Sequence, residues 1–141
     1  MKSKELTFVV VAAAMLLACS PILAHHGDAG RYEEKITVLK GTVVELQFTN
    51  PHTMIVFDVA GSGGKPTRWM AELDGTGELT RTLGWRKTTL KPGDKITITG
   101  RRVKSGSPYL SMNYDSVIAM TDTGKELFRK DAAGDVVAPR K

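Results

Sequence analysis

The stretch ITVLKGTVVELQF, residues Ile36–Phe48, decides the fold that the sequence predicts. It is rich in β-branched residues, and its last positions alternate so that Val44, Leu46 and Phe48 share one face of a strand. Gly41 lies inside it, and an interior glycine in a long strand indicates a bulge or a sharp bend. We therefore expect one long, bent strand that serves two parts of a small barrel.

The rest of the chain predicts four further strands and one helix. After an Asn-Pro turn at residues 49–52, apolar or alternating runs predict strands at 53–59, 67–73, 94–100 and 109–120. Between the second and third of these runs, DGTGELTRTLGW predicts a helix of about two turns, with Thr76 as its N-cap and Gly84 at its C-terminal cap. Glu78 lies in the first turn, where the helix dipole favours an acid.

The predicted order is three strands, a short helix and two strands. With a long bent first strand, this is the order of the OB-fold, a five-stranded partly open barrel with a helix between strands three and four. We therefore predict a mainly β, OB-fold-like barrel. An open five-stranded sheet with one helix packed on it is the alternative.

The sequence at the two ends of the chain predicts a cleaved signal peptide, an N-terminal arm and a polar C-terminal tail. Residues 1–24 have a basic start and an apolar run too short to span a bilayer, as in a secretory signal peptide. Cleavage after Ala24 leaves an N-terminal arm at 25–35, an OB-like domain at 36–120 and a polar tail at 121–141 that we expect to fray. The alternative is a membrane-anchored lipoprotein, because LLAC ending at Cys19 is similar to a lipobox.

Composition narrows the class of protein. Cys19 is the only cysteine, so a chain that begins at residue 25 has no disulfide, and the fold depends on its core. The formal net charge is +5, which attracts anions, but export to the periplasm or out of the cell argues against nucleic acid. No transmembrane span is expected in the mature chain.

Several motifs together resemble a known family. LAHHG, GTVVELQFTNPH, RWMAEL, LGWRKTTLKPGDKITITG and GSPYL, in this order, are similar to the DUF6152 family of small exported bacterial proteins of unknown function. The resemblance covers nearly the whole mature chain. It implies an exported OB-like β protein and no settled activity.

The chain has three histidines, His25, His26 and His52. If cleavage makes His25 the first residue, its α-amine and imidazole, with the imidazole of His52, supply the nitrogen-rich tetragonal set that Cu(II) prefers. His26 is a reserve ligand, and Asp28 can orient a ring from outside the shell. The alternative is that His52 has a structural role only and hydrogen-bonds within its own turn.

Other candidate residues favour structural roles. Methionines in strands are usually core filler, although thioethers also bind Cu(I); the four here are Met54, Met70, Met112 and Met120. The two tryptophans can stack on a ligand, but the core is the favoured place for both Trp69 and Trp85.

The sequence predicts a binding protein rather than an enzyme. It has no phosphate-binding loop and no nucleophile elbow, and the acids Asp58, Glu72 and Asp74 are ordinary strand-end residues. Two functions stay open. One is copper or other transition-metal binding through the histidines. The other is a metal-free module that holds an anionic ligand or an envelope protein at Arg68, Trp69 and the basic turns.

Overall fold

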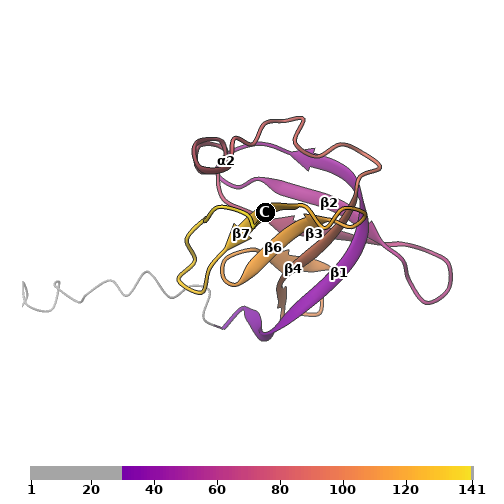
Figure 1. The fold of residues 1–141 in the computed structure, drawn as a ribbon. Helices are drawn as coiled ribbons and strands as arrows, with labels where there is room; N and C mark the ends of the chain where they lie inside the picture. The colour runs from indigo at the N-terminus through magenta and orange to yellow at the C-terminus, as the bar shows by residue number, and fades with distance from the viewer. Residues whose placement is uncertain (1–29, 141) are drawn as a thin grey trace, which may run out of the picture.

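The computed structural model describes residues 30–140, which form seven strands and one short helix (Figure 1). In chain order the elements are β1 (Tyr32–Gln47), β2 (Met54–Val59), β3 (Thr67–Glu72), α2 (Thr76–Leu83), β4 (Lys95–Val103), β5 (Tyr109–Ser111), β6 (Ser116–Met120) and β7 (Glu126–Lys130).

Five of the strands close a barrel. Antiparallel pairing joins β1 to β2 and β2 to β3, β3 runs parallel to β5, and antiparallel pairing joins β5 to β4 and β4 back to β1. This confirms the predicted OB-like fold, with the helix between β3 and β4. The barrel is closed where the prediction had it partly open, because β3 and β5 pair over three residues. The strands β6 and β7 are additional.

The long bent strand is confirmed, and Gly41 lies where β1 passes from one neighbour to the other. The next residue, Thr42, pairs with both Asp58 of β2 and Lys95 of β4. A Cβ atom at Gly41 would lie 2.7 Å from the Phe57 ring and 2.8 Å from the Asp58 carbonyl oxygen. Glycine is therefore required by close approach of the neighbouring strand.

The bulge lies beyond this glycine and corrects the predicted alternation. The register of β1 against β2 shifts between Val43 and Glu45, so Val43 is buried and Val44 only partly so. Leu46 and Phe48 pack against the core as expected. The extra residue of a bulge changes which side chains face inward, and periodicity alone does not place it.

The first strand also begins earlier than predicted. Residues 32–35 were expected in the N-terminal arm, but they belong to β1, with Tyr32 opposite Val103 of β4. Polar side chains on this segment hid the strand because they lie outside the barrel, where they need no apolar partner.

The predicted strand at 109–120 is broken into β5 and β6. Both segments pair with the same side of β4, and a non-helical turn with Asp115 at φ 46° separates them. The Ser116 hydroxyl donates to the Met112 carbonyl across this break. The interruption frees β6 to pair with β7 further along the chain.

The expectation that residues 121–141 fray is wrong for the described part of the tail. It contains β7, which carries Phe128 fully buried into the core. The indole N–H of Trp85 donates to the Leu127 carbonyl at 2.9 Å, and its ring meets Phe128 edge-on at 6.2 Å between centroids. The few large apolar side chains of this polar segment carry little periodic signal, but Phe128, with Leu127 and Val136 packed against the core, anchors the tail.

The helix matches its prediction except at its N-terminus. Gly84 adopts the left-handed conformation (φ 68°) that ends the helix, and Leu79 is buried. The N-cap is Gly75 rather than Thr76. The capping oxygen comes from the distant Asn50, whose Oδ1 accepts from both the backbone N–H and the hydroxyl of Thr76 at 3.0 Å.

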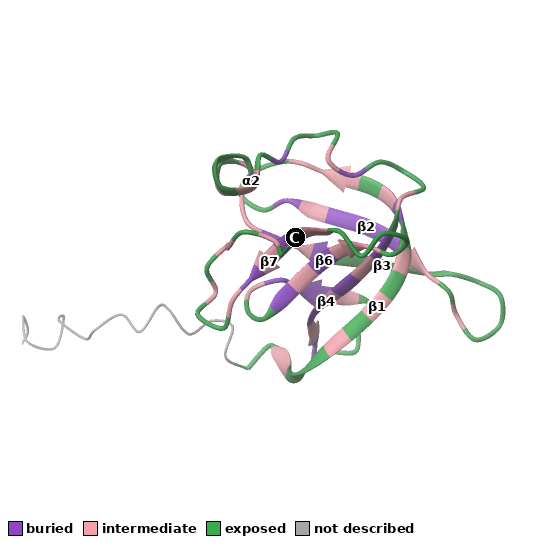
Figure 2. Cartoon of the chain, viewed as in Figure 1, coloured by how far each residue is buried: buried purple, intermediate pink, exposed green. Residues whose placement is uncertain are grey.

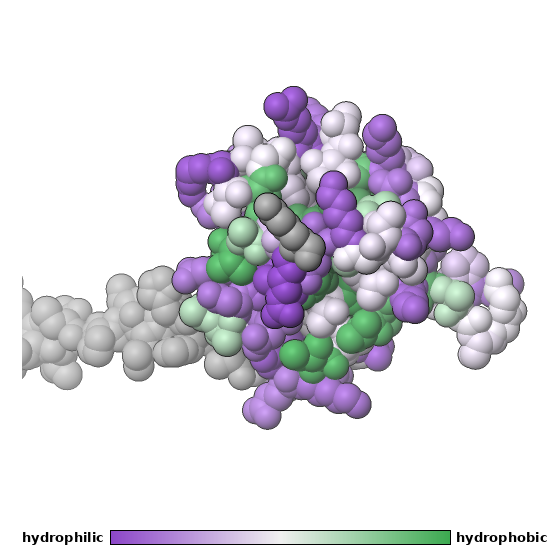
Figure 3. Space-filling model, in the orientation of Figure 1, coloured by the Kyte–Doolittle hydropathy of each residue, from purple (hydrophilic) through white to green (hydrophobic). Residues whose placement is uncertain are grey.

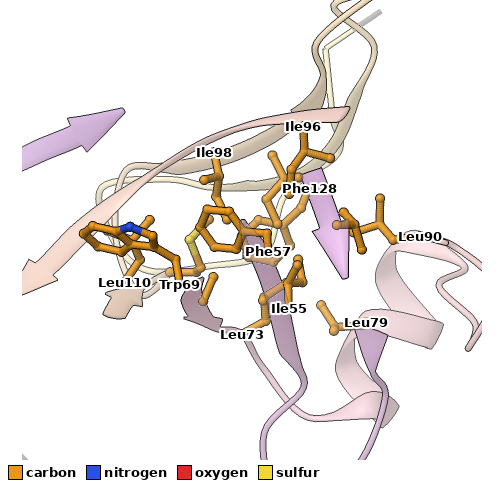
Figure 4. Close-up of a cluster of buried hydrophobic side chains, with 14 of the residues drawn as sticks. Ile55, Phe57, Trp69, Leu73, Leu79, Leu90, Ile96, Ile98, Leu110 and Phe128 are labelled. Carbon is orange, nitrogen blue, oxygen red and sulfur yellow. The ribbon is translucent and has the colours of Figure 1, made fainter. Parts of the chain in front are cut away.

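The core fills the barrel and the space under the helix. Figure 4 shows side chains from β2, β3, β4, the helix and β7 meeting in one cluster. Figure 2 shows the corresponding alternation of buried and more exposed residues along the strands. Because the interior is filled by side chains, a ligand site is to be sought on the outer surface and at the ends of the barrel.

Candidate functional site

The turn between β1 and β2 presents His52 at the surface, where 55% of the side chain is exposed. The turn is fixed on both sides. Asn50 caps the helix, and the backbone of Thr53 exchanges hydrogen bonds of 3.1 and 2.9 Å with residues 73 and 74 after β3. The exposed imidazole is thus mounted on an anchored turn.

The imidazole of His52 has two acceptors beside one of its nitrogens. Nδ1 lies 3.2 Å from the Leu73 carbonyl oxygen and 3.4 Å from Oε1 of Glu72. The Leu73 carbonyl can only accept a hydrogen bond, so Nδ1 carries the proton. In the neutral ring, Nε2 then holds the free lone pair.

Glu72 is held from its other side by Tyr109. The phenol hydroxyl of Tyr109 donates to Oε2 of Glu72. Partial burial, followed by the hydrogen bond to this carboxylate, raises the pKa of Tyr109 above its ordinary value. Tyr109 therefore remains a donor, and His52, Glu72 and Tyr109 form a continuous row of contacts, called here the histidine row.

A hollow of about 450 Å³ lies at the tyrosine end of this row. It is lined by Gly30, Arg31, Val103, Lys104, Ser105, Ser107 and Tyr109. Within residues 30–140, the side chains of Arg31 and Lys104 form no ion pair. The described chain therefore starts beside the histidine row, at a hollow with two uncompensated cations.

A second polar contact lies next to the histidine row. Lys130 of β7, whose side chain is only 8% exposed, donates to Oδ1 of Asp74 at 2.8 Å. The other carboxylate oxygen of Asp74 is buried and has no hydrogen-bond partner. This pair ties the C-terminal strand to the segment that follows Glu72 and Leu73.

The predicted metal-ligating residues lie partly within and partly outside residues 30–140. His52 is placed as above, whereas His25, His26 and Asp28 lie outside the described residues. Among residues 30–140, no group of three or more His, Cys, Asp and Glu side chains is arranged to hold a metal ion.

The other candidates occupy mostly structural positions. Met112 is fully buried and Met54 and Met120 are partly buried, whereas Met70 is exposed. Trp69 is buried under the Arg102 guanidinium, 5.1 Å from the ring centroid, so its faces are not free for stacking.

The charged candidates next to Trp69 are also engaged. Arg68 holds Asp58 through two hydrogen bonds of 3.0 and 3.1 Å, which lower the pKa of that carboxyl. The anion-binding face predicted at Arg68 and Trp69 is therefore already occupied by contacts within the chain.

The sequence did not predict the hydrogen bond of Tyr109 to Glu72, and Glu72 was interpreted as an ordinary strand-end acid. Their contact depends on the parallel pairing of β3 with β5, which places Met70 opposite Tyr109. The GSPYL motif was a signal for Tyr109, but it gave no indication of the neighbouring strand.

Among residues 30–140, no helix is long and apolar enough to cross a membrane. Together, the fold and the site define a small closed β-barrel with an exposed, oriented histidine beside a basic hollow. Residues 13–110 match a family of unknown function, DUF6152, and the chain belongs to that family. No curated protein and no solved structure matches the chain.

Proposed function

We propose that the protein binds a transition-metal ion, Cu(II) first among them, through Nε2 of His52 and the amine and imidazole of His25. The observation that carries the proposal is the environment of His52. Its Nδ1 faces a backbone carbonyl and a carboxylate, and its ring is exposed. Histidines that bind metals usually donate their second ring N–H to such a group, which fixes the tautomer and the ring orientation.

The position of the chain start supports the recruitment of His25. Gly30 and Arg31 share the hollow with Tyr109, which contacts Glu72 and through it His52. Five residues, 25–29, precede Gly30, and an extended segment of that length reaches about 17 Å. The predicted arm at 25–35 would have a longer reach, but its residues from Tyr32 onward belong to β1.

The chemistry of the proposed donors suits Cu(II). An α-amine and two imidazoles supply three nitrogens in the tetragonal arrangement that this ion prefers, and His26 is the reserve ligand. The proposed work is metal handling, by which we mean binding, delivery or sensing, without catalytic turnover. In this account residues 1–24 are a signal peptide, and the protein acts in the periplasm or outside the cell.

The test is a Cu(II) titration of the chain that begins at His25, which retains all the described elements. Replacing His52 by Ala, or adding one Gly before His25, should each weaken binding by about tenfold or more. The His26→Ala variant is the matched control and should bind nearly as well as the parent. Unchanged affinity in both of the first two variants would contradict the proposal.

Glu72 allows a finer test of the proposed orientation. Glu72→Gln keeps an acceptor oxygen for Nδ1, whereas Glu72→Leu removes it. We expect the Leu variant to lose more Cu(II) affinity than the Gln variant. Equal affinities would show that Glu72 does not orient the ring.

The second candidate is a metal-free site for an anionic ligand in the hollow between the N-terminus of β1 and the 104–107 turn. It is favoured by one observation: Arg31 and Lys104 line the hollow beside two serine hydroxyls without a carboxylate partner among the described residues. Anions are attracted to such concave basic surfaces, and salt screens the attraction.

A titration with inorganic phosphate tests this second candidate. At low salt, the amide NMR signals of Ser105 and Ser107 should shift, and Lys104→Ala should weaken the effect severalfold. Lys87→Ala, in another basic turn, is the control. No shift at low salt, or equal losses in both variants, would contradict the anion site.

A further inference from the structure

The first half of β1 has a strand neighbour on one edge only. Its residues 36–42 pair with β4, whereas pairing with β2 begins at Thr42. After β2 the chain leaves the barrel through a loop that projects from the body of the molecule, at the right of Figure 1. Among residues 30–140, no strand therefore covers the edge of residues 36–41 that faces away from β4.

The open edge exposes backbone groups of particular residues. Val43 directs its backbone toward the β4 side, because its N–H donates to the Asp94 carbonyl and its carbonyl accepts from the Gly93 N–H. Backbone direction alternates along a strand. The N–H and carbonyl groups of Ile36, Val38 and Lys40 therefore point toward the open edge.

The side chains of these residues are also unusual. Ile36 is 40% exposed and Val38 is 59% exposed, the highest value among the exposed large hydrophobic residues of the described chain. Figure 3 shows hydrophobic side chains gathered over the first half of β1, at the lower right of the view. An apolar open edge is a template for the addition of another strand.

We propose that this edge pairs with the same edge of a second copy of the chain, antiparallel about a twofold axis at Thr37. In this register Ile36 lies opposite Val38 of the second copy, and the reverse contact forms by symmetry. Both residues direct their backbone groups to the open edge, so they form a hydrogen-bonded pair.

Charge complementarity favours the second copy as the occupant. The same register places the exposed side chain of Glu34 opposite Lys40 of the second copy, and this pair also occurs twice. A register centred one residue later, on Val38, would place Ile36 opposite Lys40. The Thr37 register alone matches apolar with apolar and acid with base.

The irregular start of β1 limits the length of the pairing. The register against β4 shifts between Tyr32 and Ile36, and the Glu34 carbonyl accepts a hydrogen bond from Arg101. Glu34 thus contributes its charge rather than backbone hydrogen bonds, and Ile36 and Val38 form the centre. So short an interface belongs to the weak, concentration-dependent class.

Sedimentation equilibrium of the chain that begins at His25 tests the proposal, with a chelator present so that bound metal plays no part. From micromolar to millimolar concentration, the average mass should rise toward that of a dimer. Val38→Lys should weaken the dimer about tenfold, since it removes both apolar pairs. Met70→Lys is the control, because Met70 is an exposed apolar residue on a strand paired along both edges.

Swapping the charges at positions 34 and 40 tests the register of the proposed pairing. Glu34→Lys should weaken the dimer by placing like charges together twice, and Glu34→Lys combined with Lys40→Glu should restore it. A wild-type chain that stays monomeric at millimolar concentration would overturn the proposal, as would equal effects of Val38→Lys and Met70→Lys. A monomer whose Val38 amide is protected from exchange would show that another segment of the same chain covers the edge, and this would overturn the proposal too.

Discussion

Replacing Phe128 by Ala tests whether the C-terminal strand is part of the cooperative fold. The side chain is fully buried and meets Trp85 edge-on, and the neighbouring Leu127 carbonyl accepts the indole hydrogen bond. Truncation of a buried phenylalanine costs about 3–5 kcal/mol through lost transfer free energy and the cavity left behind. For a domain of this size, the melting temperature should fall by about 10–20 °C.

Urea unfolding followed by tryptophan fluorescence measures this cost, because Trp85 reports on the packing that the substitution disturbs. Lys125→Ala, in the exposed turn before β7, is the matched control and should change the free energy of unfolding by less than about 0.5 kcal/mol. A loss below about 1 kcal/mol for Phe128→Ala would refute the packing of this tail into the core.

Substitutions at three further positions test other parts of the fold. Gly41→Ala should destabilise the protein by about 1–3 kcal/mol, measured by urea unfolding, because its Cβ would overlap the Phe57 ring; an unchanged midpoint would contradict this. Asn50→Ala should cost about 1 kcal/mol through loss of the helix cap, whereas Asn50→Asp keeps the acceptor and should cost less. Arg129 lowers the pKa of Glu126 in the folded state, so this contribution to stability is present above the ordinary carboxyl pKa of about 4.3 and is lost as pH falls below it. Glu126→Gln should therefore flatten the acid side of the stability profile, and an unaltered acid slope would count against the pair.

The sequence predicted the barrel because its strands carry a clear period. Trp69, Ala71 and Leu73 alternate toward the core as expected, and so do Ile96 and Ile98. The early start of β1 and the presence of β7 were missed for the same physical reason. In both segments most side chains are polar, and pairing with a neighbouring strand makes them strands: the start of β1 pairs with β4, and β7 pairs with the preceding strand β6.

The candidate site was predictable only in part. The sequence predicted the Asn-Pro turn that carries His52, and in the structure 55% of this side chain is exposed. Its contact with Glu72 and the contact of Glu72 with Tyr109 depend on tertiary neighbours, as does the capping of the helix by Asn50. The periodicity of a single sequence predicts which face of a strand is buried. Contacts between side chains of different strands also depend on the order of the strands around the barrel, which periodicity does not give.

The most direct test of the metal proposal is the mass of the intact protein from the envelope of its native host, measured under native conditions and after denaturation. The account predicts a denatured mass that begins at His25 and a native mass greater by one copper ion. A mass that begins at an acylated Cys19, or a chain beginning at His25 that stays metal-free when copper is supplied, would contradict it.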